Sequence, residues 1–156
     1  MTPQSFVTAL QSVKLGNVFN LYADRCALYD VSNAPARRAQ SLLCLLTVAA
    51  DTEIEDLWIG RDLGYRGGRR TGLALTDDIH LNMHRSRWNV QVQRAKMGEM
   101  VAERTAAVVW KCSMRCLQQS FFGMSFRFTR ISLTSHLATE HIVRANAQSV
   151  RKYSLS

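Results

Sequence analysis

Runs of apolar residues at helical spacing alternate along this chain with one short run that fits a buried strand. The densest helical run follows Asn33 and Pro35, a side chain that often caps helices and a proline that the first helical turn tolerates. The run Leu57-Trp58-Ile59 is short and continuous, as in a buried strand. We expect the following elements: helices at 5–15, 34–50, 79–88 (capped by Asp77 or Asp78) and 99–117, and a strand at 57–60.

Helices around a strand predict an α/β fold with a mostly parallel sheet. One strand is too few for such a sheet, so a further strand is expected within FFGMSFRFTRISL (121–133), followed by a helix within 136–152. Helix 99–117 should bury one face. The residues expected on that face are Val101, Ala102, Thr105, Val108, Val109 and Cys112.

Length and composition fit one domain with a hydrophobic core, because 47% of the 156 residues are apolar. The sequence has no apolar run long enough to span a membrane and no basic-then-apolar N-terminal signal. We therefore expect a cytoplasmic, monomeric protein without membrane contacts, whose cysteines are reduced. They are Cys26, Cys44, Cys112 and Cys116.

The net charge of +8 is concentrated near the C-terminus. Residues 1–110 contain 13 basic and 11 acidic residues, whereas residues 111–156 contain 7 and 1. A basic tail of this kind is typical of an arm that binds nucleic acid.

The most informative stretch is LWIGRDLGYRGGRRTGLALT (57–76), a strand that opens into a glycine-rich loop. One carboxylate, Asp62, follows the strand directly and four arginines surround it. A strand, a glycine-rich turn and a reactive side chain form ligand sites at the carboxyl edge of α/β sheets. The arginines favour a ligand that carries phosphate.

This stretch resembles the first signature of the uracil-DNA glycosylase superfamily. Gly60-Arg61-Asp62-Leu63-Gly64-Tyr65 resembles its G-x-[D/E/N/A]-P-[G/Y] turn, and GLALT (72–76) resembles its second segment, G-[LRV]-x-[FL]-[ST]. The order of NVFNLYADRCALYD (17–30), the strand and ERTAAVVW (103–110) is similar to a bacterial glycosylase-like branch. The resemblance covers about residues 6–110 and implies a three-layer α/β/α fold, incomplete after residue 110.

The resemblance also implies the roles of the loop residues. Asp62 is then the catalytic residue, which orients the water that attacks the sugar C1′. The expected substrate-binding residues are Gly60, Arg61, Gly64, Tyr65 and Leu75. The expected DNA-phosphate contacts are Arg66, Gly67, Gly68, Arg69 and Arg70.

Simpler roles stay open for the same residues. Asp62 also fits a turn cap or an ion pair with Arg61 or Arg66, and the arginines fit a solvated basic loop. Leu75 stands where many members carry a phenylalanine that stacks on uracil, so it also fits a plain core position. The cysteine spacing contains no C-x-x-C, and we expect neither an iron–sulfur cluster nor another metal or cofactor.

The C-terminal part fits the family only in another reading frame. Back-translation of residues 121–148, read two bases on with favourable wobble bases, gives FWNVFPFHPHQPDQPFSNRAHSARERA. This string is similar to the asparagine-ending strand and His-Pro stretch of the branch. We therefore expect domain residues at 1–117, an out-of-frame, poorly ordered basic tail at 118–156, and an impaired or inactive product.

Two other classes of function remain alternatives. A non-enzymatic nucleic-acid-binding protein would use the arginine–glycine loop and the basic tail, although an RNA-binding RGG repeat is represented by a single Arg66-Gly67-Gly68 unit. A nucleotide-binding domain would use Gly60–Gly72 as a phosphate loop, but the G-x-x-x-x-G-K-[ST] pattern is missing.

Overall fold

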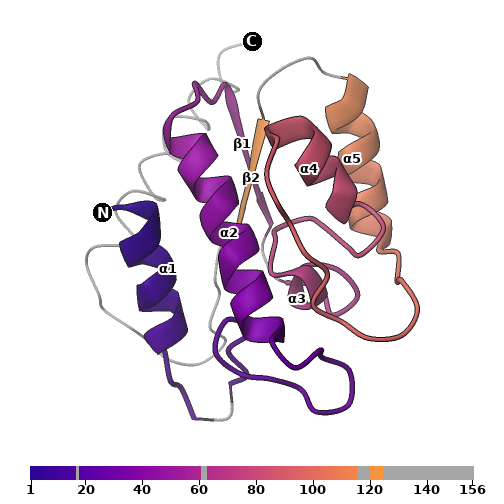
Figure 1. The fold of residues 1–156 in the computed structure, drawn as a ribbon. Coiled ribbons are helices and arrows are strands. Elements are labelled where there is room, and N and C mark those ends of the chain that lie inside the picture. Colours follow the sequence, from indigo (N-terminus) through magenta and orange to yellow (C-terminus); the bar gives the residue numbers. More distant parts are fainter. Residues whose placement is uncertain (17, 61–62, 116–119, 125–156) are drawn as a thin grey trace. The chain divides into compact units, whose positions relative to one another are not determined.

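A computed structural model describes residues 1–16, 18–60, 63–115 and 120–124 of the chain. Its elements are α1 (Pro3–Ser12), α2 (Ala34–Ala50), β1 (Asp56–Gly60), α3 (Gly68–Thr71), α4 (Leu81–Trp88), α5 (Arg104–Arg115) and β2 (Ser120–Met124) (Figure 1). All of them belong to one compact unit, Met1–Phe126. The second unit, Arg127–Ser156, lies outside the described residues, as does the helix expected within 136–152.

The two strands pair in parallel, with Trp58 opposite Phe122. The chain from α3 to α5 forms the long crossover that parallel neighbours need (Figure 1). The strand predicted at 57–60 is confirmed, and a strand lies at the start of the stretch 121–133. These two strands are the whole sheet within the described residues, so the three-layer α/β/α arrangement stays a prediction.

Helix α2 has the bounds that the sequence predicts, but its start is built differently. Pro35 lies in the first turn, while the Asn33 side chain makes no capping hydrogen bond. Asn33 has φ −108° and ψ 26°, which is not the extended conformation that directs a capping side chain at the first helical N–H groups. The expectation that Asn33 caps the helix with its side chain is therefore wrong.

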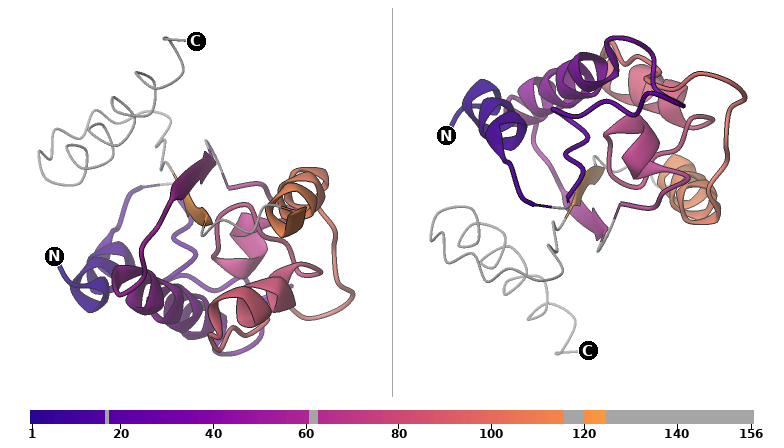
Figure 2. Two further views of the ribbon diagram at one scale, coloured as in Figure 1. Left: turned by 90° about the horizontal axis from the view of Figure 1, so that it is seen from above. Right: turned by 90° about the horizontal axis from the view of Figure 1, so that it is seen from below.

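Helix α1 begins two residues earlier than the predicted helix 5–15, because Thr2 and Ser5 form a reciprocal capping box around Pro3. It lies beside α2 in the views of Figures 1 and 2. A cluster of buried side chains joins the two helices to the segment that connects them. Its members are Val7, Leu21, Tyr22 and Ala39.

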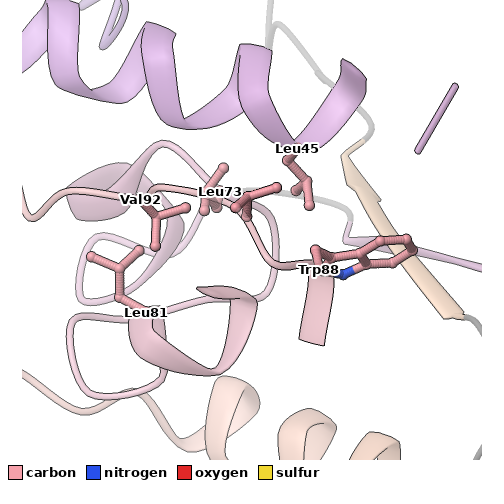
Figure 3. Packing of buried hydrophobic residues seen from close by; sticks show 6 residues of the cluster. Leu45, Leu73, Leu81, Trp88 and Val92 are labelled. Atoms are coloured by element: carbon pink, nitrogen blue, oxygen red, sulfur yellow. The ribbon is translucent and has the colours of Figure 1, made fainter. Parts of the chain in front are cut away.

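A second cluster connects α2 to the loop after β1 and to α4 (Figure 3). Leu73, which directly follows the loop, is fully buried in this cluster. Trp88, the last residue of α4, belongs to the same cluster. The cluster consists of Leu45, Leu73, Leu81, Trp88, Val90 and Val92. It fixes the end of the glycine-rich loop against α2.

Helix α5 turns a different face inward from the one predicted. Val108 and Cys112 are exposed, whereas Trp110 is fully buried against Phe122 of β2. The buried positions are Ala106, Val109, Trp110 and Ser113. The predicted face is confirmed at Val109 and wrong at Thr105, Val108 and Cys112, because the large indole at 110 determines which face can bury most apolar area.

Candidate functional site

The glycine-rich loop leaves the carboxyl end of β1 at the buried Gly60. The predicted catalytic Asp62 and its neighbour Arg61 lie outside the described residues. The loop is described again from Leu63, and its backbone folds tightly, because the Gly64 carbonyl accepts hydrogen bonds from the N–H groups of Gly67 and Arg69, both at 3.1 Å. The short helix α3 follows, an element that the sequence did not predict.

The loop glycines are explained by close approaches within the protein. A Cβ atom at Gly64 or Gly67 would overlap the carboxyl group of Glu103. One at Gly68 would overlap Leu63, and one at Gly72, which has φ +79°, would lie 2.8 Å from the Cβ of Arg38. The expectation that the glycines bring backbone close to DNA stays a prediction, but the space of their missing side chains is filled by protein atoms.

Glu103 is therefore a residue of this site that the sequence reasoning missed. It directly precedes α5, and its carboxyl group faces Gly64 and Gly67. Burial, followed by the negative charge of Asp77, raises the pKa of Glu103, while the charge of Arg66 lowers it. The signal in the sequence was a single acidic residue at a helix start, which is too common to single out.

Asp77 connects the turn before α4 to Glu103, the residue before α5. Its fully buried carboxylate accepts hydrogen bonds through Oδ1 from the N–H groups of Ile79 (3.0 Å) and His80 (2.8 Å), and His80 Nδ1 lies 2.7 Å away. Asp77 therefore caps the turn before α4, and its predicted role as the cap of a helix from Ile79 is wrong, because α4 begins at Leu81 with His80 as its N-cap and no side-chain cap. Its Oδ2 accepts from the Glu103 N–H at 2.6 Å, a long-range contact that no local pattern indicates.

Asp78 engages one of the predicted phosphate contacts. Arg70 donates to its Oδ2 from Nε at 2.7 Å and from Nη2 at 2.7 Å, and the Asp78 carboxylate is almost completely buried. Arg94 Nη2 lies 3.6 Å from the same oxygen. Arg70 is paired with Asp78 inside the protein, so it could bind phosphate only by leaving that carboxylate. Among Arg66, Arg69 and Arg70, it is therefore the least favourable phosphate contact.

The other loop side chains are more accessible. Arg66 and Arg69 are exposed, and the Arg69 guanidinium carbon lies 5.3 Å from the centroid of the Phe19 ring. Tyr65 is 75% exposed, so it forms no closed pocket wall among the described residues. Leu75 has φ +51° and packs, partly buried, against the cluster that contains Trp110.

A buried ion network contacts the glycine-rich loop near α3. Asp30 Oδ1 lies 2.6 Å from Arg38 Nη2 and 2.6 Å from Lys96 Nζ. Arg38 also donates from Nε to the Arg70 carbonyl at 3.1 Å, and the Tyr22 hydroxyl donates to the Gly72 carbonyl at 2.7 Å. Both carbonyls belong to the α3 region, so this network fixes the loop in place.

A buried histidine lies behind the second motif segment. Thr76 Oγ1 donates to the Ala74 carbonyl at 2.8 Å, so His84 Nε2, 2.7 Å from that hydroxyl, must act as the donor between them. Burial, followed by the charge of Arg87, lowers the pKa of His84 to about 3. The imidazole is therefore neutral and contacts the Trp110 ring edge-on at a centroid distance of 4.8 Å.

Within the part of the chain that the structure describes, three or more acidic, histidine or cysteine side chains never gather in an arrangement that could hold a metal ion. The helices described are also all too short or too polar to cross a membrane. Comparisons with protein-family models, curated proteins and solved structures give no match.

Proposed function

We propose that this chain is a uracil-DNA glycosylase-like repair protein. The activity of such a protein is hydrolysis of the N-glycosidic bond between deoxyribose and a damaged base that is flipped out of DNA. The three-layer α/β/α fold, DNA as the partner, a cytoplasmic location and a monomeric state belong to the same proposal. The product as written is expected to be impaired or inactive, because the second half of the site is encoded in another frame.

The observation that carries the proposal is how the two motif segments are joined. They lie on either side of α3, and each is hydrogen-bonded to it: the Gly64 carbonyl of the first segment accepts from the N–H groups of Gly67 and Arg69, both at 3.1 Å, and the buried Thr71 binds the second segment. Its hydroxyl donates to the Thr76 carbonyl at 2.9 Å and accepts from the Leu73 N–H at 3.1 Å. The described residues of both segments, 63–65 and 72–76, are thus joined through α3 and follow β1, where α/β proteins bind ligands.

The proposed chemistry assigns separate tasks to the loop residues. Asp62 orients a water molecule, whose oxygen bonds to the sugar C1′ as the bond to the base breaks. The attacking water loses one proton to the surrounding solvent as its oxygen bonds to C1′, and the base, which leaves as an anion, takes up one proton from solvent, so that the net reaction is hydrolysis. Arg66 and Arg69, both exposed, contact backbone phosphates and provide affinity without sequence preference.

Two family parts are missing from the given frame. One is the asparagine that recognises the uracil edge, and the other is the histidine that stabilises the leaving base. Sequencing the gene across codons 105–125 tests whether a base has been lost or gained there. An unchanged sequence would contradict the frame proposal.

Uracil excision from single-stranded DNA tests the activity. If the frame is restored, the protein should excise uracil, and Asp62→Asn should slow excision on the order of 10²-fold or more. The chain as given should excise far more slowly. A restored protein with no excision, or one unaffected by Asp62→Asn, would contradict the proposed function.

The net charge of +8 favours a second candidate, a nucleic-acid-binding protein without catalysis. It predicts binding to single-stranded DNA that weakens steeply with salt and does not change in Asp62→Asn. Such binding, together with an intact reading frame and no excision, would favour this candidate over the glycosylase.

A further inference from the structure

The carboxyl group of Glu103 occupies the inner side of the glycine-rich loop. Oε1 fills the space of a Gly64 side chain, and Oε2 fills that of Gly67. Both oxygens of one carboxyl group therefore lie against the backbone of the same turn, which the Gly67 N–H closes onto the Gly64 carbonyl at 3.1 Å. Any larger residue at 64 or 67 would push this carboxyl group out.

The backbone of Glu103 is anchored on both sides. Its N–H donates to Asp77 Oδ2 at 2.6 Å, and its carbonyl accepts from the Ala107 N–H at 3.0 Å in the first turn of α5. The side chain therefore starts from a fixed point and reaches the loop.

Two charged groups, besides burial, determine the electrostatics around this carboxyl group. Asp77, whose other oxygen is paired with His80, repels it, and Arg66 on the exposed side of the loop attracts it. Arg66 is also the exposed cation that the proposed function assigns to DNA phosphate. A phosphate at Arg66 would bring a second negative charge close to Glu103.

We propose that Glu103 is a positioning residue of the glycine-rich loop and that DNA phosphate competes with its carboxylate for Arg66. The inference rests on the DNA contact in the proposed function, but not on base excision. When phosphate binds, the ionised form of Glu103 becomes less favourable, so binding is linked to proton uptake at this residue. Affinity for DNA therefore increases as Glu103 becomes protonated.

The test measures binding of the full chain to an oligothymidylate, whose bases do not titrate in the working range, at low ionic strength. Glu103→Gln should bind about two- to fivefold more tightly than the wild type at pH 8, the effect of one partly exposed charge pair. Lowering the pH should tighten binding by the wild type relative to the variant, because the pKa of Glu103 is raised and its carboxylate takes up a proton. The two proteins carry the same histidines, so the difference between them isolates Glu103.

A double-mutant cycle identifies the cation. The gain from Glu103→Gln should largely disappear in an Arg66→Gln background, and should persist in an Arg69→Gln background, because Arg69 lies over Phe19. Equal gains in both backgrounds would overturn the competition for Arg66.

A second variant displaces the carboxyl group without removing it. Gly67→Ala should also tighten binding at pH 8, whereas Gly16→Ala, with no atom within 4 Å of the new Cβ, should leave it unchanged. If Glu103→Gln binds like the wild type at both pH values, or more weakly, the inference is wrong while the proposed function stands. If the wild type and Arg66→Gln bind DNA equally, or the chain does not bind DNA, the phosphate contact of the proposed function fails as well.

Discussion

Removing Asp30 tests the buried ion network more directly than any change in the loop itself. Its side chain has no exposure, and its carboxylate is the shared partner of Arg38 and Lys96, with Cys26 N–H donating to Oδ2 at 3.0 Å. Asp30→Ala leaves two cations without their anion, and one of them, Arg38, is fully buried. Removing one partner of a buried ion pair costs about 3–5 kcal/mol, a large share of the roughly 5–15 kcal/mol by which domains are stable.

The effect should depend on pH with a defined sign. Burial raises the pKa of Asp30, but the hydrogen bonds from Arg38, Lys96 and Cys26 outweigh it, so the net pKa is lowered. The ionised Asp30 carboxylate therefore stabilises the folded state fully above the unfolded-state pKa of about 3.9. This stabilisation is lost as the pH falls through the lowered folded-state pKa of Asp30. Asp30→Ala should lose this acid-side dependence.

The free energy of unfolding is measured by urea denaturation at pH 7, followed by far-UV circular dichroism. Asp51→Asn, an exposed carboxylate at the end of α2, is the matched control and should change stability by less than about 0.5 kcal/mol. If Asp30→Ala loses less than about 1 kcal/mol, the ion network does not support the loop as argued.

Three further results are expected. Leu45 of α2 is 2% exposed and packs in the same cluster as Leu73. Leu45→Ala should lower the free energy of unfolding, measured by urea denaturation, by about 2–5 kcal/mol, and a decrease below about 1 kcal/mol would contradict the packing in Figure 3. The His84 imidazole should show the Nε2–H tautomer and no titration between pH 5 and 8 in nitrogen-detected NMR, because its pKa is lowered to about 3; a midpoint near 6.5 would show that it is solvated. Gly72→Ala should destabilise the protein by about 1 kcal/mol or more, since φ is +79° and Arg38 lies against the site, and unchanged thermal unfolding would contradict this geometry.

The sequence predicted those parts of the fold that depend on local signals. Pro35 and the apolar run after it locate α2, Leu57-Trp58-Ile59 locates β1, and the position of Asp77 before a helix predicts its contacts with the next turn. Each of these depends on residues within a few positions of one another. The side chain of Asn33 is the local exception, because the chain enters α2 in a conformation that turns the amide away.

The missed features are long-range. The contact of Glu103 with Gly64 and Gly67, and that of Lys96 with Asp30, join residues far apart in sequence. Periodicity gives no information about such pairs, because it reports only which face of an element is apolar. The glycines of the loop suggested a ligand, whereas two of them are explained by the carboxyl group of Glu103, the residue before α5.

The parallel pairing of β1 with β2 has a consequence for how the protein forms during synthesis. The ribosome releases β1 long before β2, and every residue of the crossover must emerge before the first strand meets its partner. Until then β1 presents an unpaired edge that includes Leu57 and Trp58, the kind of segment that associates with other chains. Pairing strands this far apart in sequence is also intrinsically slow. We therefore expect slower translation or lower temperature to increase the yield of folded chain.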